Sequence, residues 1–136
     1  MPASRVGHIQ FNVAAPNMSF YKDLLEFLGW HTLYEDEGIL GMEDEQGASL
    51  WIAGGAKPVS NDYDGPGMNH LALAVPAQSD VDETVTYLQQ RGIPALFDTP
   101  RHRPEFSPAP EKTYYQVMFE SPDRILLEVV YLGSLL

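Results

Sequence analysis

The chain contains two copies of one pattern, a strand-like run with a histidine followed by an amphipathic helix that ends at a glycine. The first run covers residues 5–13 and carries His8, and the second covers residues 67–75 and carries His70. An internal repeat constrains the fold more than any single motif does, because each copy must form the same supersecondary unit. The repeat predicts two similar modules and a site built where they meet.

Each copy predicts a β-α-β-β-β module. In the first copy, apolar residues recur every three or four positions over residues 17–28, which indicates one buried helical face, and three short strand-like segments follow. The predicted face consists of Phe20, Leu24, Phe27 and Leu28, and the predicted strands cover residues 31–35, 39–43 and 48–53. The chain length fits one domain made of modules 5–53 and 68–132, joined by a linker at 54–67 that is rich in turn-forming residues.

The second copy repeats this order with a long insertion. Ser79 is expected to cap the helix, with Asp82 completing a capping box. Residues 99–113 contain four prolines and are therefore expected to form an exposed, irregular loop. The remaining predicted strands cover residues 94–98, 114–120 and 125–131.

Charge and composition exclude several classes of function. Nineteen acidic and eight basic residues give a net charge of −11, which repels nucleic acid and anionic lipid and attracts cationic ligands. The lack of cysteine excludes disulfides, thiolate metal sites and a cysteine nucleophile. No apolar run resembles a signal peptide or a membrane span. We therefore expect a cytoplasmic protein that binds neither nucleic acid nor membranes.

The two histidines occupy the polar face of their strands. Alternation along the first strand puts His8, Gln10 and Asn12 on one face and the apolar residues on the other. In the second strand, His70 shares its face with two alanines, which leave room beside the imidazole. Each sheet is thus expected to have an apolar side under its helix and a roomier side that holds an imidazole.

Another unusual feature of the sequence is a carboxylate within an aliphatic strand. Glu128 stands among the aliphatic residues of 125–130, where an unpaired charge would cost several kcal/mol or more. We therefore expect Glu128 to have a partner. Two imidazoles and one carboxylate are a familiar ligand set for a divalent metal ion.

Taken in order, these features resemble the vicinal oxygen chelate superfamily, which includes glyoxalases, extradiol dioxygenases, fosfomycin-resistance thiol transferases and bleomycin-resistance proteins. The resemblance covers about residues 5–132. It rests on the paired modules, the histidine strands 8–13 and 70–75, and the run 114–124 before Glu128. It implies an α+β fold in which two tandem βαβββ modules form a curled, cup-shaped mixed sheet.

Members of the superfamily hold a metal with a histidine on the first strand of each module and carboxylates on the last strands. His8, His70 and Glu128 match three of these positions, and alignment of the preceding turns puts Trp51 at the fourth. Because tryptophan cannot ligate a metal, the chain departs from the glyoxalase I and methylmalonyl-CoA epimerase patterns. It agrees better with the three-ligand pattern of the dioxygenases and thiol transferases, which leaves coordination positions open.

Other side chains are candidates for binding or catalysis. Gln10 and Asn12 either support the metal ligands or are ordinary polar residues of the cup, and Trp51 either stacks on a planar substrate or fills the core. Tyr114 and Tyr115 begin a strand that resembles one carrying catalytic tyrosines in relatives, and the sequence does not indicate which of them faces inward.

The proline-rich loop adds a cationic group. Arg101, His102 and Arg103 either form a lid over an anionic substrate or are solvated loop charges.

The resemblance implies a metal-dependent enzyme that acts on a small, oxygen-bearing, chelating substrate. Ring-cleaving dioxygenase chemistry would use Fe(II) or Mn(II), whereas isomerase, lyase or thiol-transferase chemistry would use Zn(II), Ni(II) or Mn(II). A fosfomycin-type enzyme fits less well, because those relatives carry a threonine where Gln10 stands. The alternative is a non-catalytic binding protein of the bleomycin-resistance type. Related chains commonly form homodimers in which the residue matching His8 completes the other subunit's site.

Overall fold

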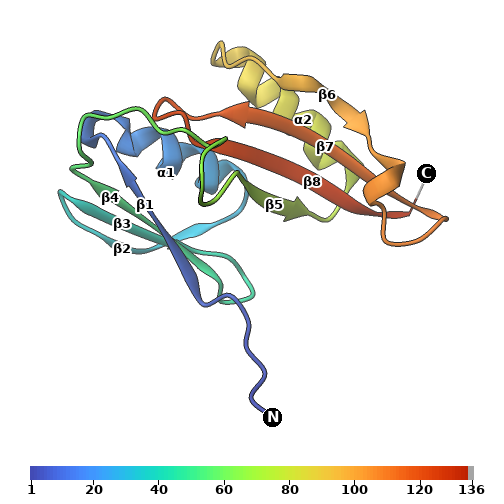
Figure 1. Cartoon of the computed structure of the whole chain (residues 1–136), viewed down its shortest axis with the longest axis horizontal. Coiled ribbons are helices and arrows are strands. Elements are labelled where there is room, and N and C mark those ends of the chain that lie inside the picture. The colour runs from blue at the N-terminus through green and yellow to red at the C-terminus, as the bar shows by residue number, and fades with distance from the viewer. Residues whose placement is uncertain (135–136) are drawn as a thin grey trace. The chain divides into compact units, whose positions relative to one another are not determined.

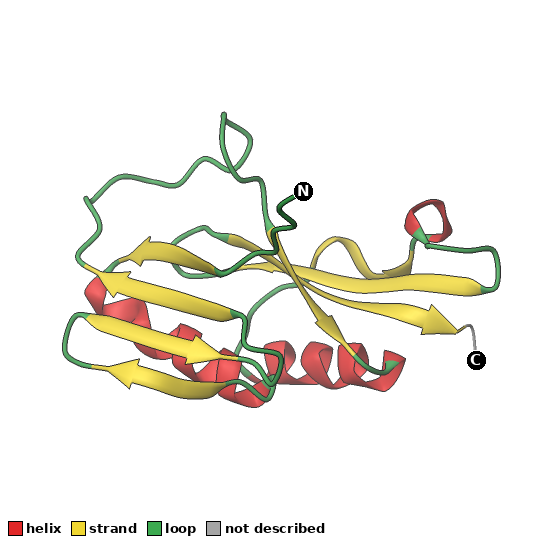
Figure 2. Ribbon diagram, turned by 90° about the horizontal axis from the view of Figure 1, so that it is seen from below, coloured by secondary structure: helices red, strands yellow, loops and turns green. Residues whose placement is uncertain are grey.

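The computed structural model describes residues 1–134 and divides the chain into two units, Met1–Ser60 and Asn61–Leu136. Each unit is a β-α-β-β-β module with one four-stranded mixed sheet (Figure 1). In both modules the first strand pairs in parallel with the last, and each helix lies against its own sheet (Figure 2). The predicted α+β fold of two similar modules is confirmed, whereas the assembly of the two sheets into one cup stays a prediction.

The first unit positions its polar strand by burying the opposite face against α1. Its elements are β1 (His8–Val13), a short 3-10 helix (Ala15–Asn17), α1 (Met18–Phe27), β2 (His31–Glu35), β3 (Ile39–Glu43) and β4 (Ser49–Gly54), with strand order β1-β4-β3-β2. Phe11 of β1 is buried, and its ring centroid lies 6.4 Å from that of Tyr21. The buried face of α1 comprises Tyr21, Leu24 and Leu25. The predicted face was wrong at Phe27, which is exposed, because the buried stripe follows the 21-24-25 spacing.

The second unit repeats the arrangement with longer strands. Its elements are β5 (Leu71–Val75), α2 (Gln78–Gln90), β6 (Leu96–His102), a short 3-10 helix (Pro104–Phe106), β7 (Lys112–Glu120) and β8 (Leu126–Ser134), with strand order β5-β8-β7-β6. Helix α2 packs on β7 and β8 through buried residues that include Val81 and Leu88. The other face of this sheet carries the polar side chains described below.

The start of α2 differs from the prediction. The helix begins at Gln78, and the Asp80 carboxylate accepts a hydrogen bond of 3.0 Å from the backbone N–H of Ala77. The predicted cap at Ser79 with Asp82 was therefore wrong. Asp80 takes this role because a carboxylate in the first turn satisfies an otherwise unpaired N–H and interacts favourably with the helix dipole.

The proline-rich segment is more regular than predicted. Strand β6 continues through Pro100 to His102, and β7 begins at Lys112, so the prediction of an irregular loop over 99–113 was wrong at both ends. A proline is compatible with β6 because this strand lies at the edge of its sheet, where one side of the backbone needs no hydrogen bond.

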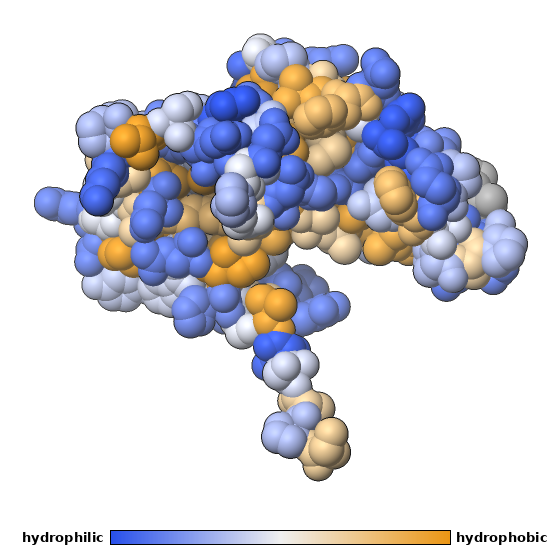
Figure 3. Space-filling model, viewed as in Figure 1, coloured by the Kyte–Doolittle hydropathy of each residue, from blue (hydrophilic) through white to orange (hydrophobic). Residues whose placement is uncertain are grey.

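The visible surface is mixed in hydropathy. Hydrophilic residues cover much of the face shown in Figure 3, and apolar residues lie between them. Within residues 1–134, no helix has both the length and the apolar character needed to cross a membrane.

Candidate functional site

Strand β1 presents three predicted site residues on its exposed face. His8, Gln10 and Asn12 are all exposed, and the Gln10 amide Nε2 donates to Asn12 Oδ1 at 3.2 Å. The parallel register pairs Gln10 with Trp51 of β4, so the indole lies on the same face of the sheet as the three polar residues. These four predicted residues are therefore neighbours within the first unit.

Trp51 has room for its indole ring because a glycine, Gly41, faces it on β3. Gly41 pairs with Trp51, and a Cβ atom at Gly41 would lie 2.7 Å from two carbons of the indole ring. The indole therefore lies flat over Gly41, with its ring centroid 6.2 Å from that of Tyr34 and its Nε1 donating to Ser49 Oγ at 3.1 Å. The result is an aromatic platform, Trp51 and Tyr34, beside the polar face of β1.

In the second unit, the parallel pairing of β5 with β8 brings His70 to Glu128. Ala72 pairs with Glu128, and His70 immediately precedes β5. The His70 Nε2 atom lies 3.0 Å from Glu128 Oε1, with 35% of the imidazole and 1% of the carboxylate side chain exposed. The predicted partner of Glu128 is thus a histidine, and the small Ala72 side chain leaves space beside the pair.

Asn69 fixes which nitrogen of His70 carries a proton. The Asn69 Nδ2 donates to the Tyr63 carbonyl oxygen at 2.9 Å, so its Oδ1 is the atom that lies 2.7 Å from His70 Nδ1. An amide oxygen can only accept, and therefore Nδ1 carries the hydrogen. In a neutral His70 imidazole, the lone pair is then on Nε2 and faces the carboxylate.

Tyr114 is the second partner of Glu128. Its hydroxyl donates to Glu128 Oε2, which leaves Oε1 to face His70. Burial, followed by the hydrogen bond to Glu128, raises the pKa of Tyr114, and the nearby Arg103 charge acts in the opposite direction. Tyr114 is therefore a neutral hydrogen-bond donor at physiological pH.

Tyr115 lies on the opposite face of β7. Its hydroxyl donates to Asp82 Oδ1 of α2 at 2.6 Å, and its ring centroid is 4.6 Å from that of His102. Burial, then the bond to Asp82, raises the pKa of Tyr115 to about 12. Of the two candidate tyrosines, the structure brings Tyr114 to Glu128 and places Tyr115 under the helix.

The cationic candidates lie at the β6 edge of the same sheet. Arg101 pairs with Gln116 of β7, and the Arg103 backbone N–H donates to the Tyr114 carbonyl oxygen at 2.6 Å. The Arg103 Nε atom donates to Gln116 Oε1 at 3.1 Å. Gln116 was not predicted as a site residue, because its contact with Arg103 depends on a β6–β7 pairing that the sequence did not indicate.

The candidate ligands are divided between the two units. His8 belongs to the first, whereas His70 and Glu128 belong to the second. Within residues 1–134, no three His, Asp or Glu side chains gather as a complete metal site. The N···O separation of 3.0 Å in the second unit's pair is that of a hydrogen-bonded histidine and carboxylate, and two ligands at right angles on one octahedral ion have a similar separation.

Comparisons with known proteins bear on the fold. No protein-family model matches the chain, and no curated protein matches it. A solved structure of a candidate glyoxalase from Bacillus halodurans matches with a TM-score of 0.76 and 24% identity, over 93% of this chain and 94% of that one. A glyoxalase/bleomycin resistance protein/dioxygenase domain from Frankia gives a TM-score of 0.69 and 22% identity, over 97% and 93% of the two chains.

A third similar structure is the fosfomycin resistance protein FosX from Listeria monocytogenes, complexed with Mn(II) and sulfate. It matches with a TM-score of 0.68 and 19% identity, over 98% of this chain and 94% of that one. All three matches extend over both modules. Because their sequence identities are 24% or lower, they support a conclusion about the fold alone. The chain therefore has the glyoxalase, bleomycin-resistance and dioxygenase fold, which confirms at the level of the fold its resemblance to the vicinal oxygen chelate superfamily.

Proposed function

We propose that the protein is a divalent-metal-dependent enzyme of the vicinal oxygen chelate superfamily that acts on a small, oxygen-bearing substrate. His8, His70 and Glu128 are the proposed metal ligands. The observation that carries the proposal is the His70–Glu128 pair, whose facing atoms are 3.0 Å apart while Asn69 holds the far side of the imidazole.

This pair requires a cation between its members. With the hydrogen of His70 on Nδ1, a neutral imidazole directs the Nε2 lone pair at the lone pairs of Glu128 Oε1. Two acceptors at 3.0 Å repel each other unless a proton or a metal ion lies between them. Of the two, a metal ion is favoured by the contact with Asn69. Ligating histidines commonly donate their other N–H to an oxygen atom, which fixes the tautomer.

The surroundings of Glu128 fit the same role. Its burial would be costly for an isolated charge, and the Tyr114 hydroxyl engages the oxygen that faces away from His70. The carboxylate is therefore held in one orientation with Oε1 directed to the ligand position. A bound metal would supply Lewis-acid stabilisation of a substrate oxyanion. Tyr114 would orient the carboxylate and hold a proton close to the substrate.

The third ligand comes from the first unit in this proposal. His8 is exposed on β1 beside Gln10 and Trp51. It would complete the site either within one chain or between two copies in a homodimer. Trp51 and Tyr34 would provide a flat surface for an apolar or planar part of the substrate.

Metal content is the test. We expect elemental mass spectrometry of the untagged protein to find close to one divalent ion per chain, with the ion lost in both His8→Ala and Glu128→Ala. Manganese is the first ion to supply in reconstitution, since the FosX structure contains Mn(II). The control is Glu43→Gln, which alters an exposed carboxylate that also lies 3.0 Å from a histidine, His31. Wild-type protein that binds no ion after anaerobic reconstitution would refute the proposal and favour a metal-independent binding protein.

A further inference from the structure

Besides the candidate ligands, the second unit carries a cationic group at the edge of its sheet. We propose that Arg103 is an anion subsite, and that the substrate bears a carboxylate, phosphate or phosphonate group in addition to its chelating oxygens. This inference rests on the proposed function, because it assigns the substrate class of the same site.

Contacts with the sheet hold the Arg103 side chain in one orientation, so it is not a freely solvated loop charge. Its Nε donates to Gln116 Oε1 at 3.1 Å, and the Gln116 side chain comes from β7 and is only 4% exposed. The Arg103 side chain itself is 21% exposed. A buried amide that orients a half-buried guanidinium fixes the direction of the fork, which lowers the entropy lost when an oxyanion binds.

The backbone that carries Arg103 is fixed from the opposite face. His102, one residue earlier, pairs with Tyr115 of β7, and its Nδ1 lies 2.5 Å from the hydroxyl of the buried Thr113 on the same strand. The His102 ring also packs beside Tyr115. Neighbouring side chains on opposite faces thus hold this edge of the sheet, and Arg103 points to the face that carries Tyr114 and Glu128.

The guanidinium has donors left for a ligand. Arginine carries five N–H groups, of which the one on Nε is used by Gln116. The Nη1 atom lies 3.7 Å from Glu105 Oε1, beyond hydrogen-bond distance, and Glu105 is exposed. An exposed pair of this kind contributes little free energy. A substrate oxyanion can therefore replace Glu105 without breaking the bond between Arg103 and Gln116.

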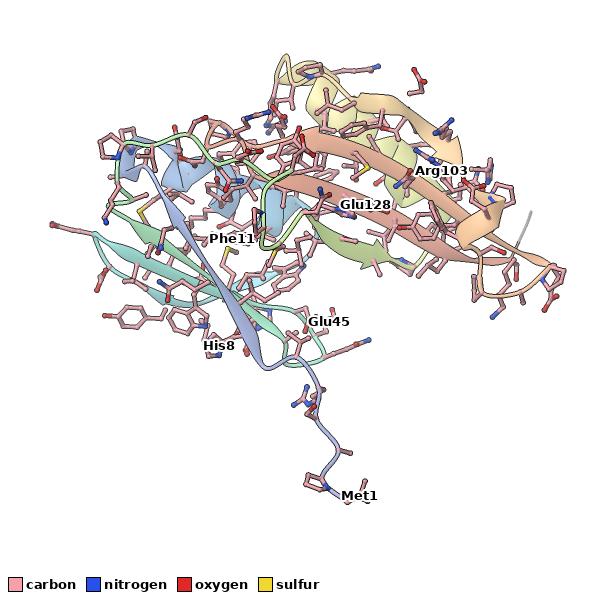
Figure 4. All side chains as sticks on the ribbon, in the orientation of Figure 1. Met1, His8, Phe11, Glu45, Arg103 and Glu128 are labelled. Atoms are coloured by element: carbon pink, nitrogen blue, oxygen red, sulfur yellow. The ribbon has the colours of Figure 1, made fainter. Side chains whose placement is uncertain are left out.

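Sheet geometry limits how far this subsite lies from the metal ligands. Glu128 is on β8, Gln116 is on the neighbouring β7, and Arg103 follows β6 at the edge of the sheet. Figure 4 labels Glu128 and Arg103. Two strand spacings amount to about 10 Å, and the Arg103 backbone bonds to Tyr114, four residues along β7 from the Met118 partner of Glu128, which adds about 13 Å along the strands. The backbones of Glu128 and Arg103 are therefore about 16 Å apart. The Arg103 side chain, which reaches Gln116, shortens this span for a substrate that chelates a metal at Glu128.

Because the net charge of the chain is −11, an anionic substrate needs a local group of cations to bind. The overall field of the chain repels anions, so binding requires a local excess of positive charge. Arg101, Arg103 and Lys112 supply three cations at this end of the sheet, against the carboxylates of Glu105 and Glu111. Arg103 is the one among the three cations that a buried side chain orients.

Anion binding to metal-free protein tests the subsite separately from the metal. Methylphosphonate is followed by 31P NMR and 13C-labelled acetate by 13C NMR, which also distinguishes a phosphonate-type from a carboxylate-type ligand. We expect Arg103→Gln to weaken binding of the preferred probe about tenfold or more, in line with the loss of charge-assisted hydrogen bonds. Arg91→Gln, at the residue that directly follows α2 on the opposite face, is the control for the same change in net charge and should bind as wild type does.

Two further variants test the role of the fork. Arg103→Lys keeps the charge and should still lose most of the affinity, and Gln116→Met should weaken binding although it leaves every cation in place. Wild-type affinity in Arg103→Gln, or equal losses in Arg103→Gln and Arg91→Gln, would overturn the subsite. Calorimetric Mn2+ binding by the same Arg103→Gln protein should match wild type. Failure of the metal proposal would therefore appear in a different measurement from failure of the anion subsite.

Discussion

Glu128→Gln should make the metal-free protein more stable while removing its response to metal. The glutamine keeps the size of the side chain, its oxygen can accept from Tyr114, and its N–H can donate to the Nε2 lone pair of His70. Both contacts survive as neutral hydrogen bonds of about 1 kcal/mol each. The desolvation cost of a carboxylate that is 1% exposed, several kcal/mol, disappears. We expect the free energy of unfolding to rise by about 1–3 kcal/mol.

The response to metal should change in the opposite direction. At a Mn2+ concentration a hundredfold above Kd, binding stabilises the wild-type protein by about 2.7 kcal/mol. If Glu128→Gln weakens binding a hundredfold, the same concentration stabilises the variant by only about 0.4 kcal/mol. Urea unfolding with and without Mn2+ measures both effects. Glu43→Gln is the matched control, because its exposed pair with His31 should affect stability by less than about 0.5 kcal/mol.

One combination of results would refute this reasoning. If Glu128→Gln lowers the free energy of unfolding of the metal-free protein by about 2 kcal/mol or more, and Mn2+ stabilises it as much as wild type, the carboxylate is a structural group. The His70–Glu128 pair would then be an ordinary buried ion pair.

Three other expectations concern the neighbours of this pair. Tyr114→Phe removes the donor to Glu128 and should lower Mn2+ affinity about 10–100-fold in calorimetry; unchanged affinity would show that the hydroxyl does not position the carboxylate. Asn69→Leu removes the acceptor of His70 Nδ1–H, so 15N NMR of the metal-free protein should show mixed tautomers, whereas a retained Nδ1–H form would exclude this role for Asn69. The folded-state pKa of Tyr115, about 12, exceeds the unfolded value of about 10, so stability present below pH 10 is lost as the pH rises toward 12. Tyr115→Phe should flatten that part of the unfolding profile, and a profile like that of wild type would contradict the assignment.

The module architecture could be predicted because hydrophobic periodicity and the repeat agree with each other. The helix expected at 17–28 forms at Met18–Phe27, and strands 31–35 and 39–43 have the predicted limits. The course of β6 could not be predicted in the same way. Prolines argue against strands in general, whereas an edge strand tolerates them, and the position of β6 at the edge follows only from the complete strand order.

The candidate site was predictable where a residue is anomalous in its own segment. Glu128 among aliphatic residues indicated a buried partner, and His70 beside alanines indicated an open face. Contacts that depend on the register between neighbouring strands could not be predicted from the sequence. The choice between Tyr114 and Tyr115 requires the register of β7 against β8, and the contact from Arg103 to Gln116 requires that of β6 against β7.

The parallel pairing of β5 with β8 also determines when the His70–Glu128 pair can exist. These residues lie at opposite ends of the second module's sequence, and β5 has no other strand neighbour than β8 among residues 1–134. During synthesis, His70 emerges long before the carboxylate that faces it, and the loop between them must close before the two can meet. A metal held by this pair would therefore stabilise the completed module without guiding its early folding. Nascent chains that stop before β8 would be unable to hold the ion through both side chains.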